Sequence, residues 1–276
     1  MSPSEIKAIL NRLHVRPRHR LGQHFLIDRQ VLTTIVESAR LKTGEAVLEV
    51  GSGLGVLTRE LLRCGAQVIA IEADRLLAQY LRETLPPDRL TVVPGDAAVV
   101  HWHKLIGGGP WKFISNLPYA ITSLALRKAL WAPRPADRVV VLAQREVGER
   151  VVAKHGKTSL LSLMVALASA SARIVRRVGR GAFFPPPKVE SAVLEIVPQS
   201  WHDRTKRWGI APEKVMEIAK RGFAHPRKQL ASNLAALGGK PYIESVLREA
   251  GLSPKARAEE LTPEAWANLA RALSVP

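Results

Sequence analysis

Between residues 46 and 143, short apolar segments alternate with amphipathic ones, and this alternation constrains the fold more than any other feature. Strands buried on both faces read as continuous apolar runs, and helices between them indicate parallel pairing. Strands are expected at 46–50, 67–71, 90–93, 112–115 and 138–143, with helices at 56–64 and 74–85. The pattern predicts an α/β fold with a mainly parallel, doubly wound sheet, and Asp28 is expected to cap a helix through Arg40.

Towards the carboxyl end the pattern changes. A helix of small residues at 160–170 is followed by strands at 172–178 and 191–197, which would add an antiparallel edge to the sheet. Past Pro198 the strand signals stop. Helices with Pro or polar starts are expected at 212–221, 227–237, 242–250 and 263–273.

We therefore predict two domains. Residues 1–199 would form the α/β domain, with a basic, partly mobile arm at 1–20. Residues 200–276 would form a small all-α domain with a net positive charge, because thirteen Lys and Arg face only eight Asp and Glu there.

Charge and cysteine content limit the partners and the compartment. Forty-one Lys and Arg against 24 Asp and Glu give a net charge of +17, and nucleic acid is the commonest cellular polyanion. The single Cys64 cannot form an internal disulfide, which fits a reducing compartment. No apolar run approaches membrane-spanning length, and we expect a cytoplasmic monomer without a membrane partner.

A glycine-rich turn follows the first apolar strand, in Glu49-Val-Gly51-Ser-Gly53-Leu-Gly55. Gly51 and Gly53 would let the backbone turn tightly beside a ligand, and Gly55 would permit close packing of the next helix. The spacing is one residue shorter than the dinucleotide fingerprint, so an NAD site is disfavoured. Glu49 suits a cationic cofactor better than a pyrophosphate. An ordinary tight turn is the simpler alternative.

Two acidic residues at later strand ends favour a nucleoside cofactor. Glu72 follows Gly51 by 21 residues, where a carboxylate can accept both ribose hydroxyls. Asp96 can accept a hydrogen bond from an adenine amino group. Together with Glu49 they indicate S-adenosylmethionine.

The tetrapeptide Asn116-Leu117-Pro118-Tyr119 indicates the chemistry. An exocyclic amine on a base is a poor nucleophile, and two acceptors around its N–H groups would turn its lone pair towards a methyl donor. The Asn116 side-chain oxygen and the Leu117 carbonyl are the candidates, since Pro118 holds the preceding residue extended. Tyr119 offers a flat surface on which an extruded base can stack. A plain turn after a strand is the alternative.

With these motifs the chain resembles, over nearly its whole length, the rRNA adenine N6-dimethyltransferases, and most closely their bacterial small-subunit branch. The first and last of the shared motifs are absent from generic methyltransferases. The motifs are Leu21-Gly-Gln-His-Phe-Leu26, Glu49–Gly55, Ile71-Glu72, Gly95-Asp96-Ala97, Ser115–Tyr119, Gln144-Arg-Glu-Val147 and Phe183–Ser191.

The resemblance implies two groups of site residues. Those on S-adenosylmethionine are His24, Leu26, Gly51, Glu72, Asp96 and Asn116. Those around the target adenine are Asn116, Leu117, Pro118, Tyr119 and Phe183. His24 departs from the family's usual Asn, and its neutral imidazole or its backbone would replace that contact. Phe183, before the rigid run Pro185-Pro186-Pro187, would form the second face of an aromatic sandwich, whereas Phe184 is expected in the core.

Other clusters carry weaker signals. The arginines at 173, 176, 177 and 180 either track phosphates or form a solvated strand face. Cys64, His101 and His103 lack the companion ligands of a zinc site, so no metal is expected.

The expected function is S-adenosylmethionine-dependent N6-dimethylation of two adjacent adenines near the 3′ end of 16S rRNA, within the small ribosomal subunit or its precursor. Residues 1–199 would bind the cofactor and hold the chemistry, and residues 200–276 would dock on the ribosomal RNA. Two alternatives stay open: a large-subunit rRNA methyltransferase of the antibiotic-resistance type, and a non-catalytic RNA-binding assembly factor. The run 185–191 and the basic tail argue against the first. Intact Asn116 and Tyr119 argue against the second.

Overall fold

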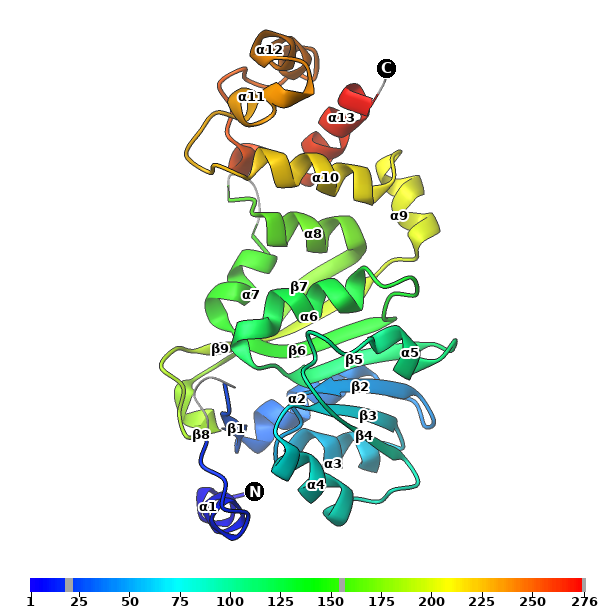
Figure 1. Cartoon of the computed structure of the whole chain (residues 1–276), viewed down its shortest axis with the longest axis vertical. Coiled ribbons are helices and arrows are strands. Elements are labelled where there is room, and N and C mark those ends of the chain that lie inside the picture. The colour runs from blue at the N-terminus through cyan, green and yellow to red at the C-terminus, as the bar shows by residue number, and fades with distance from the viewer. Residues whose placement is uncertain (18–21, 154–156, 275–276) are drawn as a thin grey trace. The chain divides into compact units, whose positions relative to one another are not determined.

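A computed structural model describes residues 1–17, 22–153 and 157–274 (Figure 1). Within these ranges a seven-stranded sheet has the order β4-β3-β2-β5-β6-β9-β7. Its strands are β2 (Ala46–Val50), β3 (Gln67–Glu72), β4 (Leu90–Pro94), β5 (Trp111–Asn116), β6 (Arg138–Gln144), β7 (Ser169–Val178) and β9 (Ser191–Pro198). Leu21 of the first resemblance motif lies outside the described residues, as do residues 18–20 of the expected arm.

The pairing of the strands confirms the expected sheet. β2, β3, β4, β5 and β6 pair in parallel, with Ala46 opposite both Gln67 and Trp111. β9 pairs antiparallel with β6, Val139 lying opposite Ile196, which provides the expected antiparallel edge. Because the carboxyl ends of parallel strands meet at one edge, residues that follow these strands come together.

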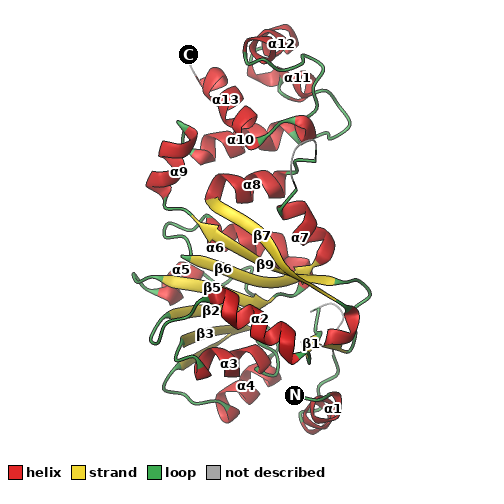
Figure 2. Cartoon of the chain, turned by 180° about the vertical axis from the view of Figure 1, so that it is seen from behind, coloured by secondary structure: helices red, strands yellow, loops and turns green. Residues whose placement is uncertain are grey.

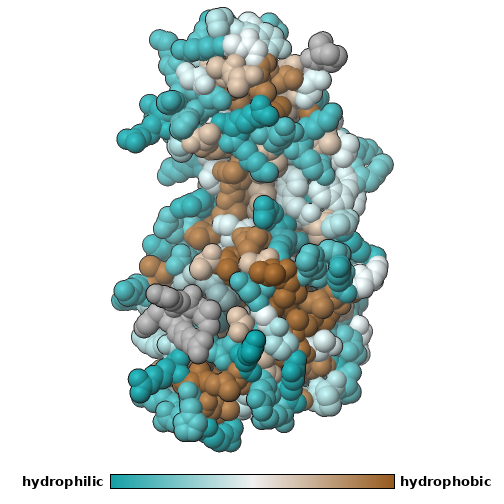
Figure 3. Space-filling view, in the orientation of Figure 1, coloured by the Kyte–Doolittle hydropathy of each residue, from teal (hydrophilic) through white to brown (hydrophobic). Residues whose placement is uncertain are grey.

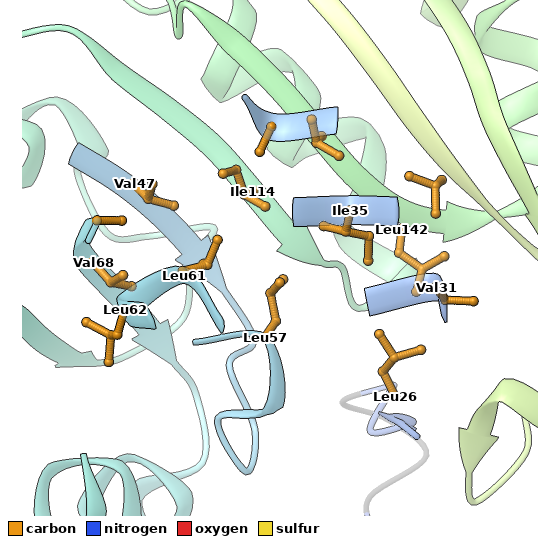
Figure 4. Packing of buried hydrophobic residues seen from close by; sticks show 14 of the residues in the cluster. Leu26, Val31, Ile35, Val47, Leu57, Leu61, Leu62, Val68, Ile114 and Leu142 are labelled. Atoms are coloured by element: carbon orange, nitrogen blue, oxygen red, sulfur yellow. The ribbon is translucent and has the colours of Figure 1, made fainter. Parts of the chain in front are cut away.

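Helices cover both faces of the sheet, as a doubly wound fold requires. Asp28 caps α2, its Oδ1 accepting the N–H groups of Gln30 and Val31 at 2.8 and 3.1 Å. Figure 2 shows α2 and α3 on one face, where Leu57 and Leu61 pack against sheet residues such as Ile114 (Figure 4). The helices of this unit are α1 (Pro3–Arg12), α2 (Arg29–Ala39), α3 (Val56–Arg63), α4 (Arg75–Thr84), α5 (Trp102–Ile106) and α6 (Thr122–Leu130). Trp102 of α5 contacts Phe113 at 5.1 Å between ring centroids on the opposite face.

The expectation of a partly mobile arm is wrong for residues 3–12, which form α1. A capping box between Ser2 and Glu5 starts the helix. Its Ile6 and Leu10 are buried in a second apolar cluster with Leu54, Leu77, Tyr80 and Phe25. The spacing of four residues places both side chains on one face, and burial of that face holds the helix against the sheet unit.

The described chain divides into two compact units. The first contains residues 1–148 and 172–198, and the second contains residues 149–171 and 199–276. The single boundary expected between residues 199 and 200 therefore differs from the structure in one segment, because residues 149–171 belong to the second unit. Helix α8 (Leu160–Ala168) packs with α10 (Pro212–Gly222) and α13 (Pro263–Ser274) because it is apolar around most of its circumference.

The second unit is helical, and hydrophilic residues cover much of the face shown in Figure 3. Its core includes Trp266, stacked on Phe223 at 5.4 Å, and a Cβ on Gly222 would lie 2.5 Å from the Trp266 ring. The expected helix at 227–237 is split into α11 and a 3-10 turn, and α9 was not expected. The helices are α7 (Arg145–Val151, shared between units), α8, α9 (Trp201–Trp208), α10 (Pro212–Gly222), α11 (Leu230–Asn233), α12 (Lys240–Glu249) and α13 (Pro263–Ser274). None of the described helices combines the length and apolar character needed to cross a bilayer.

Candidate active site

The carboxyl ends of β2, β3, β4 and β5 surround one cavity of ≈ 420 Å³. Ligands of doubly wound sheets bind at this edge, and a volume of several hundred Å³ is typical of small-molecule sites. All the residues expected on the cofactor except Gly55 line the cavity. They are His24, Leu26, Glu49, Gly51, Gly53, Glu72, Asp96 and Asn116.

The glycine-rich turn is left-handed at all three glycines, with φ of +72°, +56° and +74° at Gly51, Gly53 and Gly55. A Cβ on Gly51 would lie 2.9 Å from Pro118 Cγ, and one on Gly53 would lie 3.1 Å from the Phe25 ring. Side chains at these positions would both strain the backbone and press into the site. Gly55 instead approaches Leu81 of α4, which agrees with its expected packing role.

Glu72 is held rigidly at the end of β3. Its Oε2 accepts the Gly53 N–H at 2.8 Å, and its Oε1 accepts the Asp74 N–H at 2.9 Å. Burial raises the pKa of this carboxyl, and the two N–H groups oppose the rise. Each oxygen retains a second lone pair, so Glu72 can still accept hydroxyl groups of a ligand.

Glu49 is a buried carboxyl, only 2% exposed, on the floor of the same cavity. Thr58 Oγ1 donates to its Oε2 at 2.7 Å. Burial raises the pKa of Glu49 to about 7, and the nearby Glu72 carboxylate contributes to the rise. A cation bound beside Glu49 would favour its charged form.

Asp96 is exposed in the turn after β4. Its Oδ1 accepts the Ala98 N–H at 2.8 Å, and its backbone carbonyl accepts the N–H groups of Val99 and Val100 at 3.0 Å each. Within the described residues no donor reaches its Oδ2, which leaves that oxygen available to a ligand in the cavity.

The Asn116 amide is oriented by a residue far away in sequence. Its Nδ2 donates to the His24 carbonyl at 3.1 Å. This bond distinguishes the nitrogen from the oxygen, since a carbonyl cannot donate to a carbonyl. In the part of the chain that the structure describes, no group donates to Asn116 Oδ1, so the oxygen is available as an acceptor at the cavity.

His24 and Ser191 hold the Tyr119 ring beside the cavity, and Pro185 in turn contacts His24. The His24 ring stacks on it, with centroids 5.9 Å apart and an interplanar angle of 27°. His24 Nδ1 lies 2.8 Å from the Pro185 carbonyl, and the hydroxyls of Tyr119 and Ser191 share a hydrogen bond of 2.7 Å. The segments 22–26, 116–119 and 183–191 therefore meet through His24, Tyr119, Pro185 and Ser191.

Leu117 and Pro118 shape the turn between β5 and α6. The Leu117 side chain is buried, and its N–H donates to the Leu142 carbonyl at 3.0 Å. Pro118 lines the cavity opposite Gly51. Leu117 itself is not among the lining residues.

The expectation for Phe183 is wrong. β1 (Phe25–Leu26) pairs antiparallel with β8 (Phe183–Phe184), which places Phe183 opposite Leu26. The Phe183 side chain is 2% exposed within the main apolar cluster, so it presents no face to an extruded base. Phe184, expected in the core, is the partly exposed ring, with Lys7 Nζ 5.4 Å above its centroid.

Sequence reasoning missed the polar groups that support the site, namely Thr58, Asp74 and Ser191. Thr58 lies within α3 and Asp74 is the N-cap of α4, so neither residue stands out from ordinary helix sequence. Ser191 carried a signal, since it closes the last resemblance motif. Two of the four arginines that could either track phosphates or form a solvated face have partners within the protein. Arg173 pairs with the buried Glu195, and Arg176 donates to Gln30 Oε1 at 3.0 Å.

The sheet order, the glycine-rich turn and the acidic residues at successive strand ends define a Rossmann-like methyltransferase. A family model described as ribosomal RNA adenine dimethylase matches residues 15–274. The chain belongs to this ribosomal RNA adenine dimethylase family, and it is an enzyme that methylates rRNA adenines.

Curated relatives match this chain over nearly its full length. "Ribosomal RNA small subunit methyltransferase A" of Dehalococcoides mccartyi (strain BAV1) is 40% identical over 273 residues, covering 96% of this chain and 91% of that protein. The protein of the same name from Deinococcus radiodurans is 38% identical over 278 residues, covering 99% and 91%.

Solved structures share the fold. The 23S rRNA methyltransferase ErmE has a TM-score of 0.69 at 28% identity, covering 91% of this chain and 100% of that one. A dimethyladenosine transferase from Plasmodium falciparum has a TM-score of 0.73 at 24% identity, covering 89% and 96%.

Proposed function

We propose that this enzyme transfers methyl groups from S-adenosylmethionine to N6 of two adjacent adenines near the 3′ end of 16S rRNA, within the small ribosomal subunit or its precursor. The observation that carries the proposal is the Asn116 amide, whose nitrogen is held by the His24 carbonyl so that its oxygen is left for an amine. An acceptor fixed at the rim of a nucleoside-sized cavity suits methylation of a base.

The cavity fits this cofactor. S-adenosylmethionine, when bound, supplies an electrophilic methyl group on a sulfonium centre. Glu72 would accept the ribose hydroxyls, Asp96 Oδ2 would accept from the adenine amino group, and the buried Glu49 would favour the positive charge. Gly51 and Gly53 leave room at the turn where a Cβ would meet Pro118 or Phe25. His24 and Leu26 would close the cavity from the amino-terminal side.

The chain's own residues would prepare the target amine. Asn116 Oδ1 and the Leu117 carbonyl would each accept one N–H of the exocyclic amino group, which turns the lone pair out of the ring plane. Tyr119 would stack on the extruded adenine, and His24 supports its ring from behind. The alkylated nitrogen is acidic and would lose its proton to water, so the acceleration would come from proximity and orientation.

The choice of the small subunit is supported by the relatives. Those matching this chain at 37–40% identity in Dehalococcoides mccartyi are named as small-subunit enzymes, whereas the 23S enzyme ErmE is 28% identical. A net charge of +17 suits an RNA-bearing particle as partner. We place the enzyme in the cytoplasm as a monomer and assign particle docking to the helical unit, with the first unit holding the chemistry.

The test is incubation of the full chain with labelled cofactor and purified small or large subunits that lack the modification, followed by mapping of labelled nucleotides. Dimethylation of two adjacent adenines in 16S rRNA is expected. Label confined to 23S rRNA would identify the antibiotic-resistance type instead. Tight particle binding without label transfer would identify a non-catalytic assembly factor, and Asn116→Ala is the matched inactive control.

A further inference from the structure

Lys128 lies on the second turn of α6 and does not line the cofactor cavity. Its ammonium donates to three backbone carbonyls at once: Ala97 at 2.7 Å, Ala98 at 2.6 Å and Val100 at 2.9 Å. An ammonium has three N–H groups and no acceptor, so all three of its donors are used.

These three carbonyls belong to the turn that carries Asp96. The turn is also tied within itself, because the Asp96 carbonyl accepts the N–H groups of Val99 and Val100. Trp102 reinforces the arrangement: its Nε1 donates to the Ala97 carbonyl at 3.0 Å, and Lys128 Nζ lies 5.5 Å above its ring. Without the ammonium, the carbonyls of Ala97, Ala98 and Val100 would lose the donor that they share.

We infer that Lys128 is a positioning residue that fixes the Asp96 turn, and thereby sets the preference of the cavity for an adenine ring bearing a 6-amino group. The inference rests on the proposed role of Asp96 as acceptor of that amino group. Lys128 touches neither substrate nor cofactor, and it acts only through the turn.

Electrostatics agree with this arrangement. Burial lowers the pKa of Lys128, and the negative charge of the Asp96 carboxylate opposes the decrease. The adjacent Arg127 also contributes to the decrease. A 3-10 turn (Tyr119–Ile121) joins the Asn116–Tyr119 motif to α6, so this helix would connect the turn for the cofactor's adenine with the residues for the target adenine.

The experiment compares two ligands on the full chain by calorimetry: S-adenosylhomocysteine and its inosine analogue, in which a carbonyl replaces the 6-amino group. We expect the wild type to prefer the adenosine compound by about 10- to 100-fold, because Asp96 accepts from an amine but is left unpaired by the analogue. Asp96→Ala should bring this preference close to unity.

In Lys128→Met, which keeps the length and removes the donors, the preference should fall to about threefold or less. Adding Asp96→Ala to it should cause no further loss of preference, since both act on one contact. Lys128→Arg, which keeps a cation with several donors, should recover part of the preference. Lys104→Met removes an exposed cation of the neighbouring α5 and should leave the preference unchanged.

Lys128→Met that melts at a lower temperature yet keeps the full preference would overturn the inference, because Lys128 would then be structural only. If the methionine variant does not fold, Lys128→Gln is measured by the same criterion. Loss of the preference in Lys128→Met but not in Asp96→Ala would reject Asp96 as its mediator. A wild type that does not bind the adenosine compound would reject the proposed cofactor itself.

Discussion

At the scale of single residues, the orientation of Asn116 leads to the sharpest prediction about catalysis. Asn116→Ala should lower single-turnover methylation by about a hundredfold or more, because its oxygen would act on the amine as it reacts. Affinity for RNA should stay nearly unchanged. Quench-flow with labelled cofactor measures the rate, and turnover near that of the wild type would remove Asn116 from the catalytic role.

Tyr119→Phe is the matched comparison at the same turn. The ring is retained, so stacking should persist, and only the hydrogen bond to Ser191 is lost. A net cost of about 0.5–1.5 kcal/mol in stability is expected, together with a rate that falls far less than in Asn116→Ala. A collapse of the rate in Tyr119→Phe would show that the hydroxyl has a chemical role beyond holding the ring.

Glu49 predicts a dependence of stability on pH. Its pKa is raised to about 7 in the folded protein, so the folded state holds this proton more tightly than the unfolded chain does. The resulting stabilisation is full below the unfolded pKa and is lost as pH rises through about 7. Its size is about 3 kcal/mol between pH 4.5 and 8.

Urea unfolding of the unliganded protein at several pH values tests this prediction, with Glu49→Gln as control because it keeps the shape and removes the titration. As pH rises, the free energy of unfolding of the wild type should fall relative to that of Glu49→Gln. Cofactor affinity should change in the opposite direction, since a cation prefers ionised Glu49. Parallel pH profiles of the two proteins would show that Glu49 titrates normally.

At the scale of elements, α1 is predicted to be part of the folded core. Its buried Ile6 shares a cluster with Phe25, whose ring lies under the Gly53 turn. Ile6→Ala should therefore lower the free energy of unfolding by about 2–5 kcal/mol. Asn11→Ala, at an exposed position of the same helix, should change it by less than about 0.5 kcal/mol. Equal stability of both variants in urea unfolding would mean that α1 does not dock in solution.

Helix α8 affects how the two tasks of the chain can be separated. A cut near residue 199 would remove α10 and α13, against which α8 packs, and would expose its buried Leu163 and Leu167. A truncated protein would aggregate for reasons unrelated to RNA. Surface substitutions within the intact chain are therefore the better way to examine docking.

At the scale of the whole molecule, charge predicts how binding responds to salt. Arg227 and Lys228 are exposed in the loop between α10 and α11, and no ion pair to either is found among the described residues. If the helical unit contacts phosphates there, Arg227→Gln with Lys228→Gln should reduce the slope of log affinity against log salt by about 1 per charge. Filter binding to small subunits at several salt concentrations measures the slope.

Lys240→Gln is the control for that measurement, because Lys240 lies 3.7 Å from the Glu244 carboxylate and so has an ionic partner within the helical unit. Cofactor affinity should stay at the wild-type value in all three substitutions. An unchanged slope in the Arg227 and Lys228 variant would place the phosphate contacts elsewhere on the molecule.

Much of this molecule follows from sequence, because the type of each element depends on local periodicity. The alternation between 46 and 143 predicted the parallel sheet, and the carboxyl ends of parallel strands must meet at one edge. Glu72, Asp96 and Asn116 were therefore expected together before any contact was known. The cap at Asp28 was likewise predictable, because a cap is a local hydrogen bond.

Tertiary structure alone decided the contacts between segments far apart in the chain. Pairing of β1 with β8 turned Phe183 into the main core and left Phe184 partly exposed against the second cluster, a choice that alternation along a strand cannot make without knowing its partner. The Asn116 amide takes its orientation from a carbonyl 92 residues away, and Lys128 reaches carbonyls about 30 residues away. Such contacts depend on which surfaces are buried together, and that is a property of the whole packed chain.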